Sequence, residues 1–374
     1  MAGRASLAYL GQEDVILSGL PEVTYFLEKY SGQTQFAYRV DEVQFQADTS
    51  VFGGESYSIL PKSGDLITNA YLKTTSPPLG TTVLSSTGTL MLKYVDLYIG
   101  SQLVERLWGE FIEMKMDLEV PQTKQQALQT LTGKNVTTPL AVYTVPLPFS
   151  CFKKGLPICA LDDDVTIRVQ FYPSSMFSSV ITTVPINTIL NIEYTYLSQY
   201  EVNFIKETPQ TFIFEQIQRI EFFAPVGLNL VTCPLQFVNP VKEMFIVIQN
   251  SSARGYDYTT DGSTDQLKNL TLLFNTTERI SATIGTPIFL RNIQALEFHT
   301  RIPDRLFYMY SFSLDPEQDE PTGHVNFSRI PNQTLIINMN TSTDNRTIVI
   351  YAINYNFLAI EKGHAPVMFP NFES

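Results

Sequence analysis

The residues that could hold a metal ion are few and are spaced badly for it. The chain has only three histidines, His299, His324 and His364, and none lies in an HxH or HExxH pattern. Those spacings are the ones that bring two imidazoles onto one metal. The acidic run 162–164 lacks the spacing and the closing glutamate of an EF-hand loop. We therefore predict no metal site and no cofactor, and we interpret the acidic run as a solvated turn.

Motifs for nucleophilic chemistry are missing as well. The sequence has no G-x-S-x-G elbow, the turn that exposes a catalytic serine, and its glycines form no phosphate loop. The three cysteines, Cys151, Cys159 and Cys233, leave one unpaired in any disulfide scheme and match no zinc pattern. We expect free thiols in a reducing compartment. The sequence predicts no catalytic residue, and we expect the protein not to be an enzyme.

Composition excludes further classes of function. With 25 Lys and Arg against 37 Asp and Glu, the net charge is −12, and no basic run occurs. Direct nucleic-acid binding is not expected, because neutralising phosphates needs clustered cations. The sequence starts without a secretory leader and has no apolar run of bilayer length. We expect synthesis in the cytoplasm, and we interpret the eight N-x-[ST] sequons as chance matches in an Asn- and Thr-rich chain.

Alternation of apolar and polar residues dominates the rest of the chain and predicts strands. The period of two, with many Phe and Tyr, is typical of pleated and half-buried surfaces. Breakers such as Pro and Gly separate the segments. The predicted strands are 36–47, 57–60, 65–75, 90–99, 140–147, 165–172, 187–197, 212–223, 241–249, 267–275, 293–299, 306–314, 334–339 and 347–360. Residues 111–131 are predicted to be a helical insertion on the outside of the sheets, because Gln and Lys cover much of it.

The chain also resembles itself. LYIGSQLVER at 97–106 is similar to LLFNTTER at 272–279, and GDLITNAYL at 64–72 aligns with PVKEMFIVI at 240–248. Further matches join 194–197 to 355–358 and 161–169 to 330–338. Because the order is kept and the offsets drift by only a few residues, we predict two similar all-β domains in tandem. The Glu-Arg pair that closes the first match is expected to be a surface ion pair of little energetic worth.

Short, turn-bounded strands in this number predict two tandem eight-stranded antiparallel jelly rolls. We place an N-terminal arm at 1–35, the first jelly roll at 36–200, a linker at 201–210 and the second jelly roll at 211–374. The linker is chosen because EVNFIKETPQ is polar and holds a proline.

Several stretches resemble the major capsid proteins of nucleocytoplasmic large DNA viruses, such as iridoviruses and phycodnaviruses. The resemblance covers nearly the whole chain, with its clearest parts at 11–37, 237–249, 310–330 and 351–369. It implies a double jelly-roll capsid subunit that trimerises into pseudo-hexagonal capsomers and tiles an icosahedral virion shell. Implied partners are neighbouring capsomers, penton and minor capsid proteins, and an inner membrane reached through minor proteins.

The most specific signature of this resemblance lies in two short runs. Its residues are Gly323, Asn326, Phe327, Ser328, Arg329, Asn354, Tyr355 and Asn356. If 325–330 is a strand, Phe327 and Arg329 share one face, so we expect Phe327 in the core and Arg329 beside a carboxylate or carbonyl. Asn326 and Ser328 would satisfy backbone groups of the preceding corner.

A second hypothesis from another class is a carbohydrate-binding jelly roll, such as a lectin or fibre head. Exposed aromatic residues of the polar loop 254–266, Tyr256 and Tyr258, would carry that function.

Overall fold

The computed structural model describes residues 4, 7–9, 11–22, 24–27, 32–46, 51–76, 79–182 and 184–369. Residues 1–35 and 36–374 form two compact units. The first contains helix α2 (Gln12–Ser18), where the Asp14 carboxylate accepts a hydrogen bond from the Gly11 N–H at 2.8 Å. Everything below concerns the second unit.

The first set of strands folds into two four-stranded antiparallel sheets. Their orders are β1-β8-β3-β6 and β2-β7-β4-β5. The bounds are β1 Ala37–Gln44, β2 Glu55–Ile59, β3 Leu66–Thr75, β4 Leu92–Ile99, β5 Gln102–Trp108, β6 Val142–Pro146, β7 Val165–Phe171 and β8 Asn187–Tyr196.

The second set repeats that arrangement. Its sheets have the orders β9-β17-β11-β14, with β15 added beside β11, and β10-β16-β12-β13. The bounds are β9 Gln210–Ala224, β10 Leu230–Leu235, β11 Pro240–Asn250, β12 Leu267–Phe274, β13 Thr277–Ile280, β14 Tyr308–Ser311, β15 Val325–Asn326, β16 Gln333–Met339 and β17 Arg346–Ile360.

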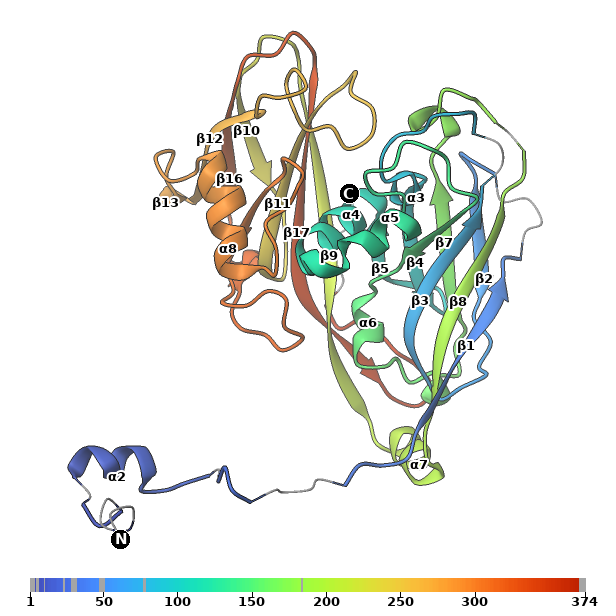
Figure 1. Cartoon of the computed structure of the whole chain (residues 1–374), viewed down its shortest axis with the longest axis vertical. Helices are drawn as coiled ribbons and strands as arrows, with labels where there is room; N and C mark the ends of the chain where they lie inside the picture. The colour runs from blue at the N-terminus through green and yellow to red at the C-terminus, as the bar shows by residue number, and fades with distance from the viewer. Residues whose placement is uncertain are drawn as a thin grey trace. The chain divides into compact units, whose positions relative to one another are not determined.

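Strand for strand, the two sets have the same topology, which is that of a jelly roll (Figure 1). The sequence repeats fall on equivalent strands: the hairpin β4–β5 matches β12–β13, β3 matches β11, β8 matches β17 and β7 matches β16. The predicted double jelly roll is therefore confirmed. The predicted strands leave out β5, β10 and β13. In β10 the alternation is short and contains Pro234.

Alternation decides which side chains fill each jelly roll. In β7, Ile167, Val169 and Phe171 point inward and are buried, while the residues between them are more exposed. In the second jelly roll, Leu335 and Ile337 of β16 are buried in the same way. Two facing sheets thus bury every second residue between them.

The remaining elements are short helices and turns between strands. Their bounds are α3 Thr87–Leu90, α4 Gly109–Glu119, η1 Gln122–Lys124, α5 Gln125–Leu131, α6 Ser150–Lys153, η2 Ile158–Ala160, η3 Ser174–Met176, α7 Gln199–Glu207, η4 Ile288–Ile293, α8 Gln294–Phe298 and η5 Phe327–Arg329. Helix α7 occupies the predicted linker and begins with a capping box between Ser198 and Glu201.

Two predictions about helices were wrong. The helical insertion exists as α4 and α5, but α4 is buried between the two jelly rolls rather than lying at the surface, since Phe111, Ile112 and Met114 are at most 2% exposed. Residues 293–299, predicted as a strand, lie at the end of η4 and in α8. This segment packs along β14, where the Gln294 side chain accepts a hydrogen bond from the Ser311 N–H at 2.9 Å. Tertiary packing there overrides a weak local preference.

Candidate functional site

The two jelly rolls of the chain meet at a layer that we call the central layer. It consists of β5 and α4 from the first jelly roll and the outer face of the β9-β17-β11-β14 sheet from the second (Figure 1). The ring of Phe111 lies 5.9 Å from the rings of Phe245 and Tyr351, and Trp108 lies 5.9 Å from Tyr351. Aromatic pairs of this geometry bury large areas. The β9-β17-β11-β14 sheet is therefore buried on both faces, which explains why its strands are hydrophobic without alternation.

Helix α4 also carries charged side chains into this layer. Glu113 and Asp117 are 1% and 0% exposed. Arginine side chains reach them from the loop after α8: Arg305 Nη2 lies 3.0 Å from Glu113 Oε1, and Arg301 pairs with Asp117. Burial lowers the pKa of Arg305, but Glu113 together with Tyr258 and Tyr256 outweighs burial and raises the pKa, so the guanidinium stays charged. Buried charges are tolerated only when paired in this way.

Asp117 has further partners that make it a junction. Its carboxylate accepts hydrogen bonds from the Asp304 N–H at 2.9 Å and from the ammonium of Lys134, which is almost fully buried. Glu113 likewise accepts from the hydroxyls of Ser86 at 2.6 Å and Thr89 at 2.9 Å. Both carboxylates therefore fix the second jelly roll's loop against the first jelly roll.

A second group of charges lies at the other end of the layer. Glu215 of β9 pairs with Lys242 of β11, and Lys115 of α4 lies 3.8 Å from the same carboxylate. Burial would raise the pKa of Glu215, but Lys242 and Lys115 lower it to about 2. This glutamate is ionised, and its charge is balanced by a lysine from each jelly roll.

Glu105 of β5 lies near this group and is only 3% exposed. Its carboxyl oxygens accept hydrogen bonds from the Ser150 N–H at 2.9 and 3.1 Å. Burial raises the pKa of Glu105 to about 8, outweighing Ser150 and Lys115, which lower it. The predicted surface pair with Arg106 is wrong, because Arg106 instead contacts Asp96 at 2.7 and 2.8 Å.

His299, at the end of α8, connects the loop that follows this helix to strand β11. Its Nε2 lies 2.6 Å from Glu243 Oε1, and its Nδ1 lies 3.1 Å from Glu317 Oε1. Burial lowers the pKa of His299, but the two carboxylates outweigh it and raise the pKa to about 10. The imidazolium therefore acts as a fixed cation between two acids.

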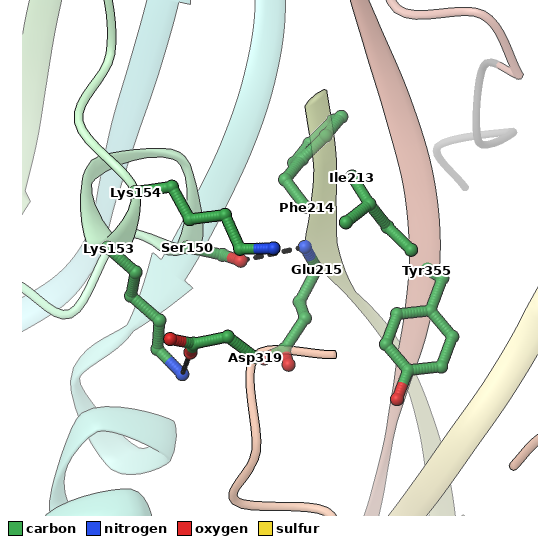
Figure 2. Close-up of a pocket in the computed structure, with 8 residues that line it drawn as sticks. All are labelled: Ser150, Lys153, Lys154, Ile213, Phe214, Glu215, Asp319 and Tyr355. Atoms are coloured by element: carbon green, nitrogen blue, oxygen red, sulfur yellow. Dashed lines mark hydrogen bonds and ion pairs between the residues drawn. The ribbon is translucent and has the colours of Figure 1, made fainter. Parts of the chain in front are cut away.

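A small pocket opens at the edge of the central layer (Figure 2). Its volume is about 260 Å³ including open solvent, which is below the usual range for ligand sites. Its charged residues pair with neighbours: Lys153 with Asp319 at 3.1 Å and Lys154 with Glu320 at 2.6 Å. The Ser150 hydroxyl accepts a hydrogen bond from the Glu215 N–H at 2.8 Å. These contacts tie α6 to the second jelly roll and arrange no nucleophile with a base.

The signature around Phe327 is a turn, not a strand. After two residues of β15 the chain enters η5, so the predicted alternation over 325–330 was wrong. Phe327 is buried as expected, with its ring 5.4 Å from Phe274 and 5.6 Å from Phe312. Arg329 is exposed and needs no buried partner, because the tight helix turns it away from the Phe327 face.

Asn326 and Ser328 both accept hydrogen bonds from backbone N–H groups, one within the turn and one from the segment before β11. Asn326 Oδ1 accepts from the Ser328 N–H at 3.1 Å, and Ser328 Oγ accepts from the Asn239 N–H at 2.7 Å. Gly323 has φ of +143°, a backbone conformation that other residues rarely adopt. An added Cβ would also lie 3.3 Å from the Phe312 carbonyl oxygen. These residues shape the corner that leads into β16.

The second signature run lies on β17 and reaches the first jelly roll. Asn356 Nδ2 donates to Gln216 Oε1 at 2.6 Å, and Gln216 Nε2 donates to the Val104 carbonyl at 2.7 Å. Asn354 is fully buried and its Oδ1 accepts from Gln218 at 2.9 Å. The Tyr355 ring lies 6.4 Å from that of His324, which joins the two signature runs.

The aromatic residues of the lectin hypothesis are not exposed. Tyr258 is 2% exposed and donates to Glu110 at 2.9 Å. Tyr256 packs against the core, and the Arg305 guanidinium lies 5.0 Å from its ring centre. These residues were expected at a loop tip, but they are held inside the central layer, so they cannot stack on a sugar.

Sequence reasoning did not find the charged residues of the central layer. A signal existed in α4, where Glu113, Lys115 and Asp117 interrupt an otherwise apolar run. Within the described ranges, no group of three or more His, Cys, Asp or Glu residues could hold a metal ion. The same part of the chain has no helix long and apolar enough to span a membrane.

Comparisons with known proteins agree with this architecture. A family model described as "Major capsid protein N-terminus" matches residues 24–205, and one described as "Large eukaryotic DNA virus major capsid protein" matches residues 201–366. The chain is 27% identical to the major capsid protein of Pyramimonas orientalis virus and 23% identical to that of Paramecium bursaria Chlorella virus 1, with 99% of each chain covered in both cases.

Solved structures give the same fold. The quasi-atomic structure of the PBCV-1 virus capsid matches with a TM-score of 0.83 at 19% identity, covering 93% of this chain and 100% of the other. The Faustovirus major capsid protein matches with a TM-score of 0.75 at 11% identity, covering 96% of both chains.

Proposed function

Because the chain belongs to the family of large eukaryotic DNA virus major capsid proteins, it is a structural component of the virion capsid rather than an enzyme, and we propose that it acts as a homotrimer. Three copies would form a pseudo-hexagonal capsomer, and capsomers would tile an icosahedral shell.

The equal topology of the two jelly rolls is the observation that carries this proposal. Both have the same strand order, so one chain supplies two similar blocks. Three chains in a ring present six similar blocks, which approximates a hexagon and packs side by side in a plane. The central layer supports this role, since its buried contacts hold the two blocks in one orientation.

The proposal also covers the protein's partners in the capsid and where in the host cell it is made and assembled. We propose contacts with neighbouring capsomers, penton proteins and minor capsid proteins, with any inner membrane reached only through minor proteins. Synthesis and assembly would take place in the host cytoplasm. A net charge of −12 would keep free capsomers apart in solution and away from the genome.

The domain boundaries and the signature residues are part of the same proposal. An arm at 1–35, a jelly roll at 36–200, a linker at 201–210 and a jelly roll at 211–374 are supported by sheets whose strands end at Tyr196 and start again at Gln210. The signature residues Gly323, Asn326, Phe327, Ser328, Arg329, Asn354, Tyr355 and Asn356 are proposed to shape the second jelly roll and not to bind a ligand.

Native mass spectrometry of the purified protein tests the proposal directly. We expect the mass of three 42.2 kDa chains, and electron microscopy should show hexagonal particles that form sheets at high concentration. A protein that stays monomeric at all concentrations would rule the capsomer out. A glycan array then serves as the test of the lectin hypothesis, for which we expect no binding.

A further inference from the structure

In each jelly roll, a helical segment follows the edge strand of the second sheet, which is β5 in the first jelly roll and β13 in the second. Helix α4 follows β5, and η4 with α8 comes next along the chain after β13. The first of these helices is covered, because α4 packs on the outer face of the second jelly roll's β9-β17-β11-β14 sheet. The second is left uncovered by the residues that the structure describes. Its side chains Ile288, Ile293 and Leu296 are 65%, 40% and 74% exposed, and we call them the helix face.

The helix face is exposed although the helix itself is firmly held. Leu290 and Ala295 of the same segment are fully buried, and Gln294 is hydrogen-bonded to β14. Arg291 contacts Asp265 at 2.6 Å. The helix face is therefore an exposed apolar patch on a helix that is fixed in place.

A matching surface lies on the first jelly roll. The β1-β8-β3-β6 sheet is the counterpart of the sheet that α4 covers. Its outer face presents Tyr38 and Val40 at 69% and 50% exposure, together with the half-buried Tyr71 and Ile189. The register confirms that these residues share one face, since Tyr71 lies opposite Asn191 and Ile189 opposite Lys73. We call Tyr38, Val40, Tyr71 and Ile189 the sheet face.

We propose that the helix face of one copy docks on the sheet face of a second copy, repeating between chains the contact that α4 makes within the chain. The inference rests on the proposed capsomer and names the surfaces that close it. Figure 1 shows the two helices on the same side of their respective jelly rolls, and the uncovered sheet on the opposite side of the first. In the described part of the chain, the helix face and the sheet face are thus both left exposed.

Such a contact joins two different surfaces, so it is heterologous and adds copies head to tail. Heterologous contacts either close into a ring or grow into a filament. In a ring of such chains, contacts within a chain alternate with contacts between chains. Both kinds of contact place a helix on the outer face of a sheet. Beside the sheet face, the same side of that sheet carries Asn69 and Glu193, at the positions where the covered sheet has Phe245 and Tyr351. The contact between chains is therefore the weaker of the two junctions.

Two single variants test the surfaces. Leu296→Glu places a charge in the helix face, and Val40→Glu places one in the sheet face. For each we expect the trimer fraction at micromolar concentration to fall at least tenfold by mass photometry. Leu230→Glu is the matched control, because Leu230 is 59% exposed on β10, outside both faces. Circular dichroism and melting temperature should be unchanged, since all three side chains are at least half exposed.

Mixing the two variants distinguishes this contact from a symmetric one. The Leu296→Glu chain keeps its sheet face and the Val40→Glu chain keeps its helix face, so the mixture should form 1:1 dimers but no trimers. A helix-to-helix contact would let Val40→Glu dimerise alone, and that result would overturn the proposal.

Wild-type protein separates failure of this inference from failure of the capsomer. If the wild type is monomeric, the proposed function itself is wrong. If the wild type is trimeric and both variants remain trimeric, the capsomer stands and these two surfaces are not its interface.

Discussion

The outer faces of the two equivalent sheets differ, and the difference shows how one fold is adapted to two positions. In the second jelly roll the face carries Phe245, Val247 and Tyr351, all buried against α4. The equivalent positions of the first jelly roll hold Asn69, Tyr71 and Glu193, so two of the three are polar, and all three stay at least partly exposed. At the repeat offset of 176, Asn69 stands where Phe245 does, since 245 − 69 = 176. The topology is the same, and only the side chains on one face decide whether a permanent junction forms.

The helices that follow the fifth strand of each jelly roll, β5 and β13, show the same difference. α4 combines Phe111 and Met114 with charged residues that find partners in the second jelly roll. The η4–α8 helix keeps its apolar residues outward and pairs Arg291 within its own jelly roll. Burying ion pairs needs a fixed partner of good geometry, which the same chain can guarantee. A contact between chains has to form from solvated surfaces and is better served by side chains that are tolerable in water.

Among the variants that test this comparison, Phe245→Ala is expected to change the free energy of unfolding most. The variant removes the ring that packs on Phe111 and should lower the free energy of unfolding by about 4 kcal/mol. Asn69→Ala, at the equivalent exposed position, is the control and should change it by less than about 0.5 kcal/mol. Urea denaturation measures both. Equal effects would show that the two faces are not different in energetic role.

The charged part of the comparison is tested by Asp117→Ala. The variant leaves the buried Lys134 and Arg301 without their carboxylate and should cost about 3 kcal/mol. Glu42→Ala is the matched change in the first jelly roll, where Glu42 lies 3.4 Å from Lys73 at the exposed face. We expect a loss below about 1 kcal/mol there. Thermal melting of both variants compares the two losses of stability. A small loss from Asp117→Ala would mean that water reaches the central layer.

The pH dependence of stability offers a third test, through His299. Its pKa is raised from 6.5 to about 10 in the folded protein, so its contribution is complete below pH 6.5 and is lost as the pH rises toward 10. Wild-type stability should fall by roughly 2–5 kcal/mol over that interval. His299→Gln should be less stable at pH 6 but should lose less on raising the pH. Chemical denaturation at several pH values measures the slope. Parallel curves for both proteins would contradict the assignment.

The smallest effect is expected at the turn before β16. The turns η2 and η5 precede equivalent strands, and at the offset of 169 Phe327 matches Ile158 and Arg329 matches Ala160, because 327 − 169 = 158. Arg329→Ala therefore gives the second turn the residue of the first, and unfolding free energy should change by less than about 0.5 kcal/mol. Phe327→Ala is the positive control, since that ring is buried. A large loss from Arg329→Ala would restore the idea of a structural partner for this guanidinium.

Strand identity and the repeat could be predicted from sequence because they are local. The period of two in 165–172 and 334–339 is visible without knowing any neighbour, and the prediction of two jelly rolls needed little more. The residues 293–299 failed because their apolar pattern is short and fits both strand and helix. The edge of β14, 9 or more residues further along the chain, decides between them.

The sequence by itself determined the fold class, the duplication and the absence of a recognisable catalytic motif. Only the tertiary structure decided that α4 is buried, that Glu113 and Asp117 meet arginines far along the chain, and that Tyr256 and Tyr258 face inward. The physical reason is distance in sequence. A side chain's alternation with its neighbours is fixed locally, whereas the partner that makes its burial favourable is set by how two completed jelly rolls pack together.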